Sequence, residues 1–162
     1  MVATHPSAAE VWAWLGEIAD PEIPVLSILD LGIVRQVAWN PNRDELTIGI
    51  TPTYSGCPAM DVIAEEIRRC SKEHGIENLR LLTQLSPAWT TDWMTDDAKA
   101  RLREYGIAPP ASSLVQIEAA RPACPRCGSA ETQVVSRYGS TPCQALYRCL
   151  SCLEPFNAFK RH

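Results

Sequence analysis

The sequence of 162 residues lacks any apolar run near the ~18 residues that a membrane-spanning helix needs. Its start, MVATHPSAAE, has neither a basic segment nor an apolar core, so no secretory signal is expected. Hydrophobic residues make up 46% and charged residues 21%, which excludes a disordered or fibrous chain. These features predict a cytoplasmic globular protein that does not enter membranes.

Several enzyme motifs are also missing. Neither G-x-x-x-x-G-K-[ST] nor G-x-G-x-x-G occurs, so the sequence gives no support to nucleotide binding. The three histidines, His5, His74 and His162, are scattered near the termini or a turn, which gives no support to a Ser-His-Asp or Cys-His hydrolase. Because no general base, cofactor motif or open metal position can be named, we expect no enzymatic activity from the chain alone.

Charge is distributed unevenly along the chain. Residues 1–120 hold nine Lys and Arg against 17 Asp and Glu, whereas residues 121–162 hold six against two. An acidic body followed by a basic tail suggests two modules. The acidic body argues against nucleic-acid binding, because phosphates attract positive charge. On charge grounds the tail could bind nucleic acid by itself.

Hydrophobic periodicity predicts an α+β first domain over residues 1–107, with helices packed against a small sheet. The expected helices span residues 7–19, 58–74 and 95–105, and the expected strands span residues 33–39, 46–50 and 79–85. Ser7 and Glu10 have capping-box spacing at the first helix, which Asp20-Pro21 should end. A proline-containing linker over residues 108–120 should lead to a small β domain over residues 121–162.

Seven cysteines in a reducing compartment suggest metal ligands or reactive thiols. Four of them form two CxxC pairs with 21 residues between the pairs: Cys124, Cys127, Cys149 and Cys152. Strands at residues 132–138 and 144–148 would make the intervening hairpin. Four thiolates suit one tetrahedral zinc per chain, and a closed set of four leaves no catalytic position. Free thiols and a redox or iron–sulfur site are the alternatives.

Three other cysteines lie outside these pairs. Cys143 is a buried small side chain, an extra metal ligand or a transfer thiol. Cys70 shares a helix face with Ile63 and Ile67 and is expected in the core. Cys57, between Gly56 and a helix-starting proline, should be the helix N-cap, where peptide dipoles favour the nucleophilic, metal-binding thiolate. The alternative for Cys57 is a cysteine that only fills the cap position.

Carboxylates and tryptophans supply further candidates. Asp20 and Glu22 flank a proline and are either ligands for iron or another hard metal, or parts of a turn that ends a helix. Asp30 is expected to be a turn former. Trp89 and Trp93 would line a pocket or interface, or pack in the core.

Three segments resemble a known family. DPEIPV at residues 20–25, ILDLGIV at 28–34 and TPTYSGCP at 51–58 resemble the opening signature and cysteine loop of the SufT-like iron–sulfur assembly domain. With the four-cysteine ribbon, the segments PAWTTDWM at 87–94 and STPC at 140–143 are similar to the D-subunit family of the phenylacetyl-CoA 1,2-epoxidase (phenylacetate ring-oxygenase) system.

The resemblance implies an accessory subunit of a multicomponent monooxygenase in aerobic phenylacetate catabolism. The oxygenase and reductase subunits would be the partners, and the chain would mature or insert an iron or iron–sulfur centre. Cys57, Asp20 and Glu22, with the neighbouring hydroxyl of Thr53, would handle iron or a cluster in transit. A purely structural scaffold subunit and a nucleic-acid-binding zinc ribbon are the alternatives, and the sequence allows a homodimer.

Overall fold

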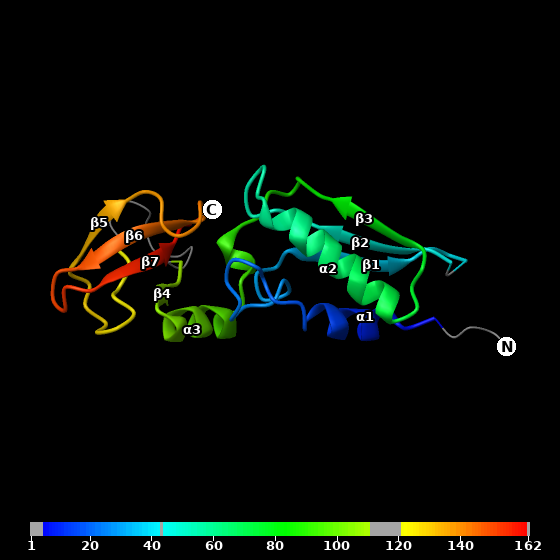
Figure 1. Cartoon of the computed structure of the whole chain (residues 1–162), viewed down its shortest axis with the longest axis horizontal. Helices are drawn as coiled ribbons and strands as arrows, with labels where there is room; N and C mark the ends of the chain where they lie inside the picture. Colours follow the sequence, from blue (N-terminus) through cyan, green and yellow to red (C-terminus); the bar gives the residue numbers. More distant parts are fainter. Residues whose placement is uncertain (1–4, 43, 111–120, 162) are drawn as a thin grey trace. The chain divides into compact units, whose positions relative to one another are not determined.

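The computed structural model describes residues 5–42, 44–110 and 121–161, and the chain divides into two compact units (Figure 1). The first is Met1–Trp89 and the second is Thr90–His162. Helices and a small sheet in the first unit and a β-ribbon in the second confirm the expected α+β class. Within the described residues, no helix combines the length and the hydropathy required to cross a membrane.

The first unit is built on a three-stranded sheet in the order β1-β2-β3. Strands β1 (Val34–Trp39) and β2 (Leu46–Ile50) form the expected antiparallel hairpin. Strand β3 (Leu79–Thr83) pairs parallel to β2, and helix α2 (Ala59–Glu73) makes the connection that a parallel pair requires. Figure 1 shows α2 running along one face of this sheet.

The core of the first unit follows the sequence periodicity. Leu46, Ile48 and Ile50 alternate along the central strand and are all buried. Ile63 and Ile67, one helical turn apart on α2, are buried as well. Cys70 lies one turn further on but is only half-buried, because it lies toward the exposed end of α2, so the expectation of a core position is wrong.

Helix α1 (Ala8–Leu15) begins with the expected capping box, in which the Ser7 hydroxyl accepts from the Glu10 N–H and the Glu10 carboxylate accepts from the Ser7 N–H. It ends at Gly16 rather than continuing to residue 19. The following backbone instead pairs with a later segment: the Ile28 N–H donates to the Ile18 carbonyl, and the Asp20 N–H to the Leu26 carbonyl. Because residues 18 and 20 form these bonds, the helix does not continue to residue 19.

The second unit contains a short 3-10 turn η1 (Thr91–Trp93), helix α3 (Asp96–Tyr105) and a four-stranded sheet. Thr95 caps α3 and Gly106 ends it in the left-handed conformation (φ 96°), as the sequence suggested. The sheet order is β4-β7-β6-β5, with bounds Ile107–Ala108, Pro155–Phe159, Gln144–Cys149 and Thr132–Ser136 respectively.

The structural boundary lies earlier than the division after residue 107 that the sequence suggested. Strand β4 pairs in parallel with β7, so Ile107 and Ala108 are joined to the ribbon sheet by backbone hydrogen bonds. Of the expected linker, residues 111–120 lie outside the described residues. A strand of two residues carries no periodicity, so the sequence could not reveal this pairing.

The central strand β2 should dominate the stability of the first unit. Ile48→Ala removes a fully buried side chain, and we expect it to lower the free energy of unfolding by about 2–5 kcal/mol. Urea titration followed by tryptophan fluorescence measures this, since Trp12, Trp14, Trp39 and Trp89 lie in this unit. Val62→Ala on the exposed side of α2 is the control, with a change within about 0.5 kcal/mol. Equal effects of the two changes would contradict the assignment of the core.

Candidate functional site

The two CxxC segments form two turns with the same backbone pattern. In the first, the Cys124 N–H donates to the Ser129 carbonyl at 2.9 Å, and in the second the Cys149 N–H donates to the Glu154 carbonyl at 3.0 Å. In both turns the N–H of the first cysteine thus donates a hydrogen bond to the carbonyl of the fifth residue after it. We call them the first and second knuckles, residues 124–129 and 149–154.

Both knuckles need a left-handed residue at the fourth position after their first cysteine. Gly128 occupies it in the first knuckle with φ 74°, and Leu153 occupies it in the second with φ 65°. Glycine takes this conformation without steric cost, whereas for leucine it costs about 1–2 kcal/mol. Leu153 is the one non-glycine residue with positive φ among the residues the structure describes.

The knuckles bring four sulfur atoms together. The Sγ atoms of Cys124, Cys127, Cys149 and Cys152 all lie within 4.8 Å of one another. Cys127 and Cys149 are 3.5 Å apart and Cys124 and Cys152 are 3.7 Å apart, measured between Sγ atoms. Tetrahedral zinc with bonds of about 2.3 Å separates its sulfur ligands by roughly 3.8 Å. The donor set and its spacing therefore fit one zinc ion with a closed coordination shell.

The electrostatics of the cluster favour a cation. A hydrogen bond from the Cys152 N–H to Sγ of Cys149, at 3.4 Å, lowers the pKa of the Cys149 thiol to about 6. The Glu154 N–H favours the Cys152 thiolate too, but partial desolvation of this exposed thiol and the neighbouring thiols outweigh it and raise the pKa of Cys152 to about 12. Four thiolates at this spacing repel one another unless a positive ion lies between them.

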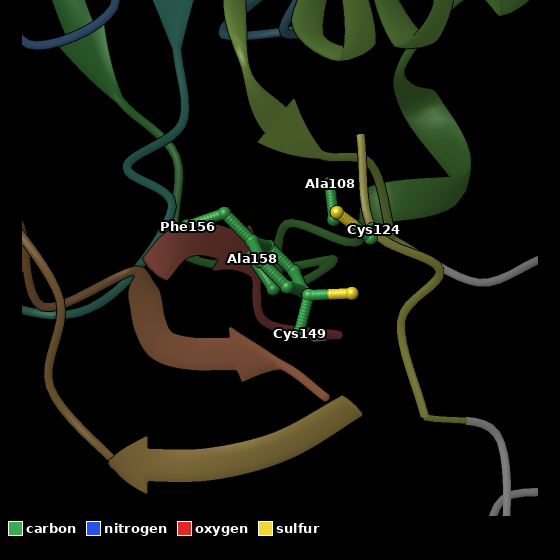
Figure 2. Packing of buried hydrophobic residues seen from close by; sticks show 5 residues of the cluster. All are labelled: Ala108, Cys124, Cys149, Phe156 and Ala158. Carbon is green, nitrogen blue, oxygen red and sulfur yellow. The ribbon is translucent and has the colours of Figure 1, made fainter. Parts of the chain in front are cut away.

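The four thiols differ in their surroundings. Cys124 and Cys149 are buried and belong to an apolar cluster with Ala108, Phe156 and Ala158 (Figure 2). Cys127 and Cys152 are exposed, so one side of the group of four thiols contacts solvent and the other side is buried. The hydroxyls of Ser129 and Ser151 lie 2.8 Å apart and link the two knuckles.

Cys143 lies apart from this cluster, although it belongs to the same sheet unit. Its side chain is buried, and its Sγ lies 2.9 Å from the Thr141 hydroxyl. Its carbonyl accepts a hydrogen bond from the Lys160 N–H. In the described residues the group of close thiols has four members and does not include Cys143.

Cys57 lies near the start of α2, but one residue before the N-cap position that was expected for it. Pro58, not Cys57, occupies the cap position and already has helical dihedral angles (φ −67°, ψ −22°), and no side chain caps the helix. Cys57 is half-buried; its N–H donates to the Tyr54 carbonyl, and its own carbonyl accepts from the Met60 N–H. The cap position therefore falls at Pro58, one residue after the expected Cys57.

Asp20 organises the turn that follows the first helix. Its side chain is 5% exposed, and its Oδ1 accepts hydrogen bonds from the Glu22 N–H at 2.9 Å and the Ile23 N–H at 2.8 Å. Burial raises the pKa of Asp20 above its usual value despite these two bonds. Burial, and then the charge of Asp20, also raise the pKa of the half-buried Glu22.

The predicted site residues differ in whether they lie close enough together to bind a metal ion. Across residues 5–42, 44–110 and 121–161, the ribbon thiols form a group of three or more potential ligands close enough to hold an ion; Cys57, Asp20 and Glu22 do not. Thr53 is half-buried in the cysteine loop. Trp89 is buried, and its indole N–H donates to the Leu31 carbonyl at 2.7 Å.

Sequence reasoning missed the special position of Leu153. The signal was present, because Gly128 follows the first CxxC directly and Leu153 follows the second directly. Aligning the two pairs would have placed a leucine where a glycine is expected.

Two family models match parts of the chain. Residues 8–72 match the family described as iron-sulfur cluster assembly protein, and residues 108–160 match the PaaD zinc beta ribbon domain. The first match includes the loop of Cys57, and the second includes the four ribbon thiols.

Two solved structures resemble a part of the chain. The domain of unknown function DUF59 from Bacillus anthracis has a TM-score of 0.54 at 25% identity, covering 59% of this chain and 90% of that one. A conserved hypothetical protein from Thermotoga maritima has a TM-score of 0.52 at 20% identity, covering 62% of this chain and 97% of that one, which supports the fold.

Two curated relatives extend the comparison. A protein of Porphyromonas gingivalis (strain ATCC BAA-308 / W83), named as an Fe-S protein maturation auxiliary factor, is 32% identical over 89 residues, which cover 54% of this chain and 83% of that protein. A protein of Escherichia coli (strain K12), named as the D subunit of 1,2-phenylacetyl-CoA epoxidase, is 51% identical over 156 residues, which cover 96% of this chain and 93% of that protein. The chain therefore belongs to the D-subunit family of 1,2-phenylacetyl-CoA epoxidase.

Proposed function

We propose that the chain is a non-catalytic accessory subunit of a phenylacetyl-CoA epoxidase system in phenylacetate catabolism. Its task is to mature or insert an iron or iron–sulfur centre of the oxygenase or reductase subunit. The observation that carries the proposal is the near full-length similarity to the D subunit of an epoxidase, in a chain that joins an iron–sulfur assembly domain to a four-thiol ribbon.

In this proposal Cys57 is the thiol that holds the iron cargo. It lies just before the first turn of α2, and cysteine sulfur is the usual protein ligand of iron–sulfur clusters. A cluster such as [4Fe–4S] needs about four protein ligands. One thiol with the carboxylates of Asp20 and Glu22 makes a weak, incomplete set, which suits a cargo that must leave again. Thr53 supplies a hydroxyl in the same loop.

The ribbon has a different role in this proposal. Cys124, Cys127, Cys149 and Cys152 hold one structural zinc, and the ribbon presents a surface to the partner subunits. A closed shell of four thiolates activates no water or substrate, so the zinc acts through folding and not through chemistry.

A scaffold without a metal-transfer role is the second candidate. It is favoured by the geometry of Asp20, whose Oδ1 is already engaged by two backbone N–H groups. It is also favoured because Cys57, Asp20 and Glu22 form no close group of three ligands among the described residues. In this case the chain would only hold the oxygenase components together.

Replacing Cys57 separates the two candidates. Cys57→Ser should reduce the iron content and the epoxidase activity of the co-expressed complex several-fold, because serine is a much poorer iron ligand. Metal analysis and activity of the purified complex measure this. Cys70→Ser, a change to another half-buried thiol of the first unit, is the control and should leave both values unchanged. Unchanged values for Cys57→Ser would favour the scaffold.

Removing one ribbon ligand tests the structural zinc. The wild-type chain should contain about one zinc, and Cys149→Ser should lose it and unfold the ribbon, since a module of roughly 40 residues buries too little surface to fold alone. Zinc analysis and tryptophan fluorescence should show metal loss with the first unit still folded. Cys143→Ser should keep its zinc; zinc loss there would make Cys143 a ligand.

Asp20→Asn should stabilise the fold increasingly as the pH rises. The pKa of Asp20 is raised in the folded state. The contribution of its carboxyl group to the free energy of unfolding is therefore most favourable below the unfolded pKa of 3.8, and it is lost as the pH rises through the folded pKa. Asparagine keeps an acceptor oxygen for the same two N–H groups but never ionises.

Urea denaturation at several pH values between about 3 and 7 measures the difference between variant and wild type. Glu10→Gln is the contrasting control: hydrogen bonds from Ser7 lower the pKa of Glu10, so this variant should lose stability relative to wild type as the pH rises.

If Asp20→Asn folds better yet abolishes iron delivery, Asp20 acts in iron handling; if delivery persists, Asp20 only forms the turn.

A further inference from the structure

The second knuckle exposes two leucines on one turn. Leu150 is 46% exposed and Leu153 is 58% exposed, and both lie within the five residues that begin with Cys149. Arg126 lies in the first knuckle, next to Cys127, and is also exposed. The short Sγ distances and the contact between Ser129 and Ser151 hold the two knuckles side by side. We call Arg126, Leu150 and Leu153 the knuckle surface.

Nothing within the described residues accounts for the side chain of Leu153. It is too exposed to stabilise the ribbon core, and it is not a metal ligand. The left-handed backbone at this position disfavours leucine, and the equivalent position of the first knuckle is the glycine that such a turn favours. A residue that is both strained and exposed where glycine would serve is best explained by a contact outside the chain.

We propose that the knuckle surface docks onto another protein subunit, at an apolar pocket rimmed by carboxylates. The inference rests on the proposed function as an accessory subunit, and it names the surface used. Two uncharged apolar side chains with an arginine beside them fit a protein interface, where the core is depleted of charged residues and arginine is enriched.

Charge favours an acidic partner. Residues 121–162 hold six Lys and Arg against two Asp and Glu, whereas residues 1–120 hold nine against 17. One zinc ion and four thiolates leave the metal centre anionic, but the ribbon keeps a positive excess. An acidic surface is therefore attracted to the ribbon and repelled by the rest of the chain, which directs association to this end.

A nucleic-acid partner fits less well. The knuckle surface offers two aliphatic side chains and no aromatic ring on which a base could stack.

The test measures binding of the zinc-loaded full chain to the purified oxygenase component and, separately, to the purified reductase component of the epoxidase system. Leu153→Gly should weaken binding to one of them about tenfold or more, because it removes a central apolar contact. The same change should leave zinc content unchanged and the ribbon's melting temperature unchanged or raised, because glycine relieves the backbone. A merely structural leucine would not give this combination.

Two further variants sharpen the test. Leu150→Ser should weaken the same interaction, and raising the salt concentration should weaken wild-type binding. Leu85→Ser, at a position 65% exposed in the first unit, is the matched control and should leave the affinity within about twofold.

Other outcomes would overturn the inference. If wild type binds and neither leucine matters, the knuckle surface is not the docking site while the proposed function stands. If wild type binds neither component, both proposals fail. If sedimentation shows self-association that Leu153→Gly abolishes, the occupant is a second copy of the chain and not an acidic partner subunit.

Discussion

The convergence of four sulfur atoms on one point is the constraint on which the ribbon depends. Of the twelve largest fully buried side chains among the described residues, ten belong to the first unit, and the second unit contributes only Leu102 and Gln144. Packing alone therefore gives the ribbon little stability. Cys124 and Cys149 compensate by belonging both to the thiol cluster and to the apolar cluster around Phe156. A metal bound there ties the two knuckles to the sheet behind them.

The first unit is held by different forces, and its candidate site reflects this. Buried aliphatic side chains on β2 and α2 form its core. Against this background Asp20 is an unusual residue, because a buried carboxylate costs free energy unless its oxygens are hydrogen-bonded. Two N–H groups supply part of that compensation on one oxygen. The turn function of Asp20 is visible in these bonds, and any iron-handling role would be added to it.

The comparison of Gly128 with Leu153 separates folding from function within the ribbon. Both knuckles close through equivalent hydrogen bonds, so folding places the same demand on both positions. Only the first knuckle has glycine, the residue that takes the left-handed conformation without steric cost. A local conflict between a residue and its conformation is typical of positions selected for something other than stability.

The sequence alone determined the α+β class, the β1–β2 hairpin, the capping of α1 and α3, and the identity of the four ribbon thiols. These follow from local rules, since hydrophobic spacing, cap residues and CxxC pairs act within a few residues. The tertiary structure decided the end of α1 at Gly16, the half-exposure of Cys70, and the pairing of β4 with β7. It also placed Asp20 in a buried turn. Each of these depends on segments distant in sequence or on backbone geometry, because burial and strand pairing are set by what packs against a residue and not by its neighbours along the chain.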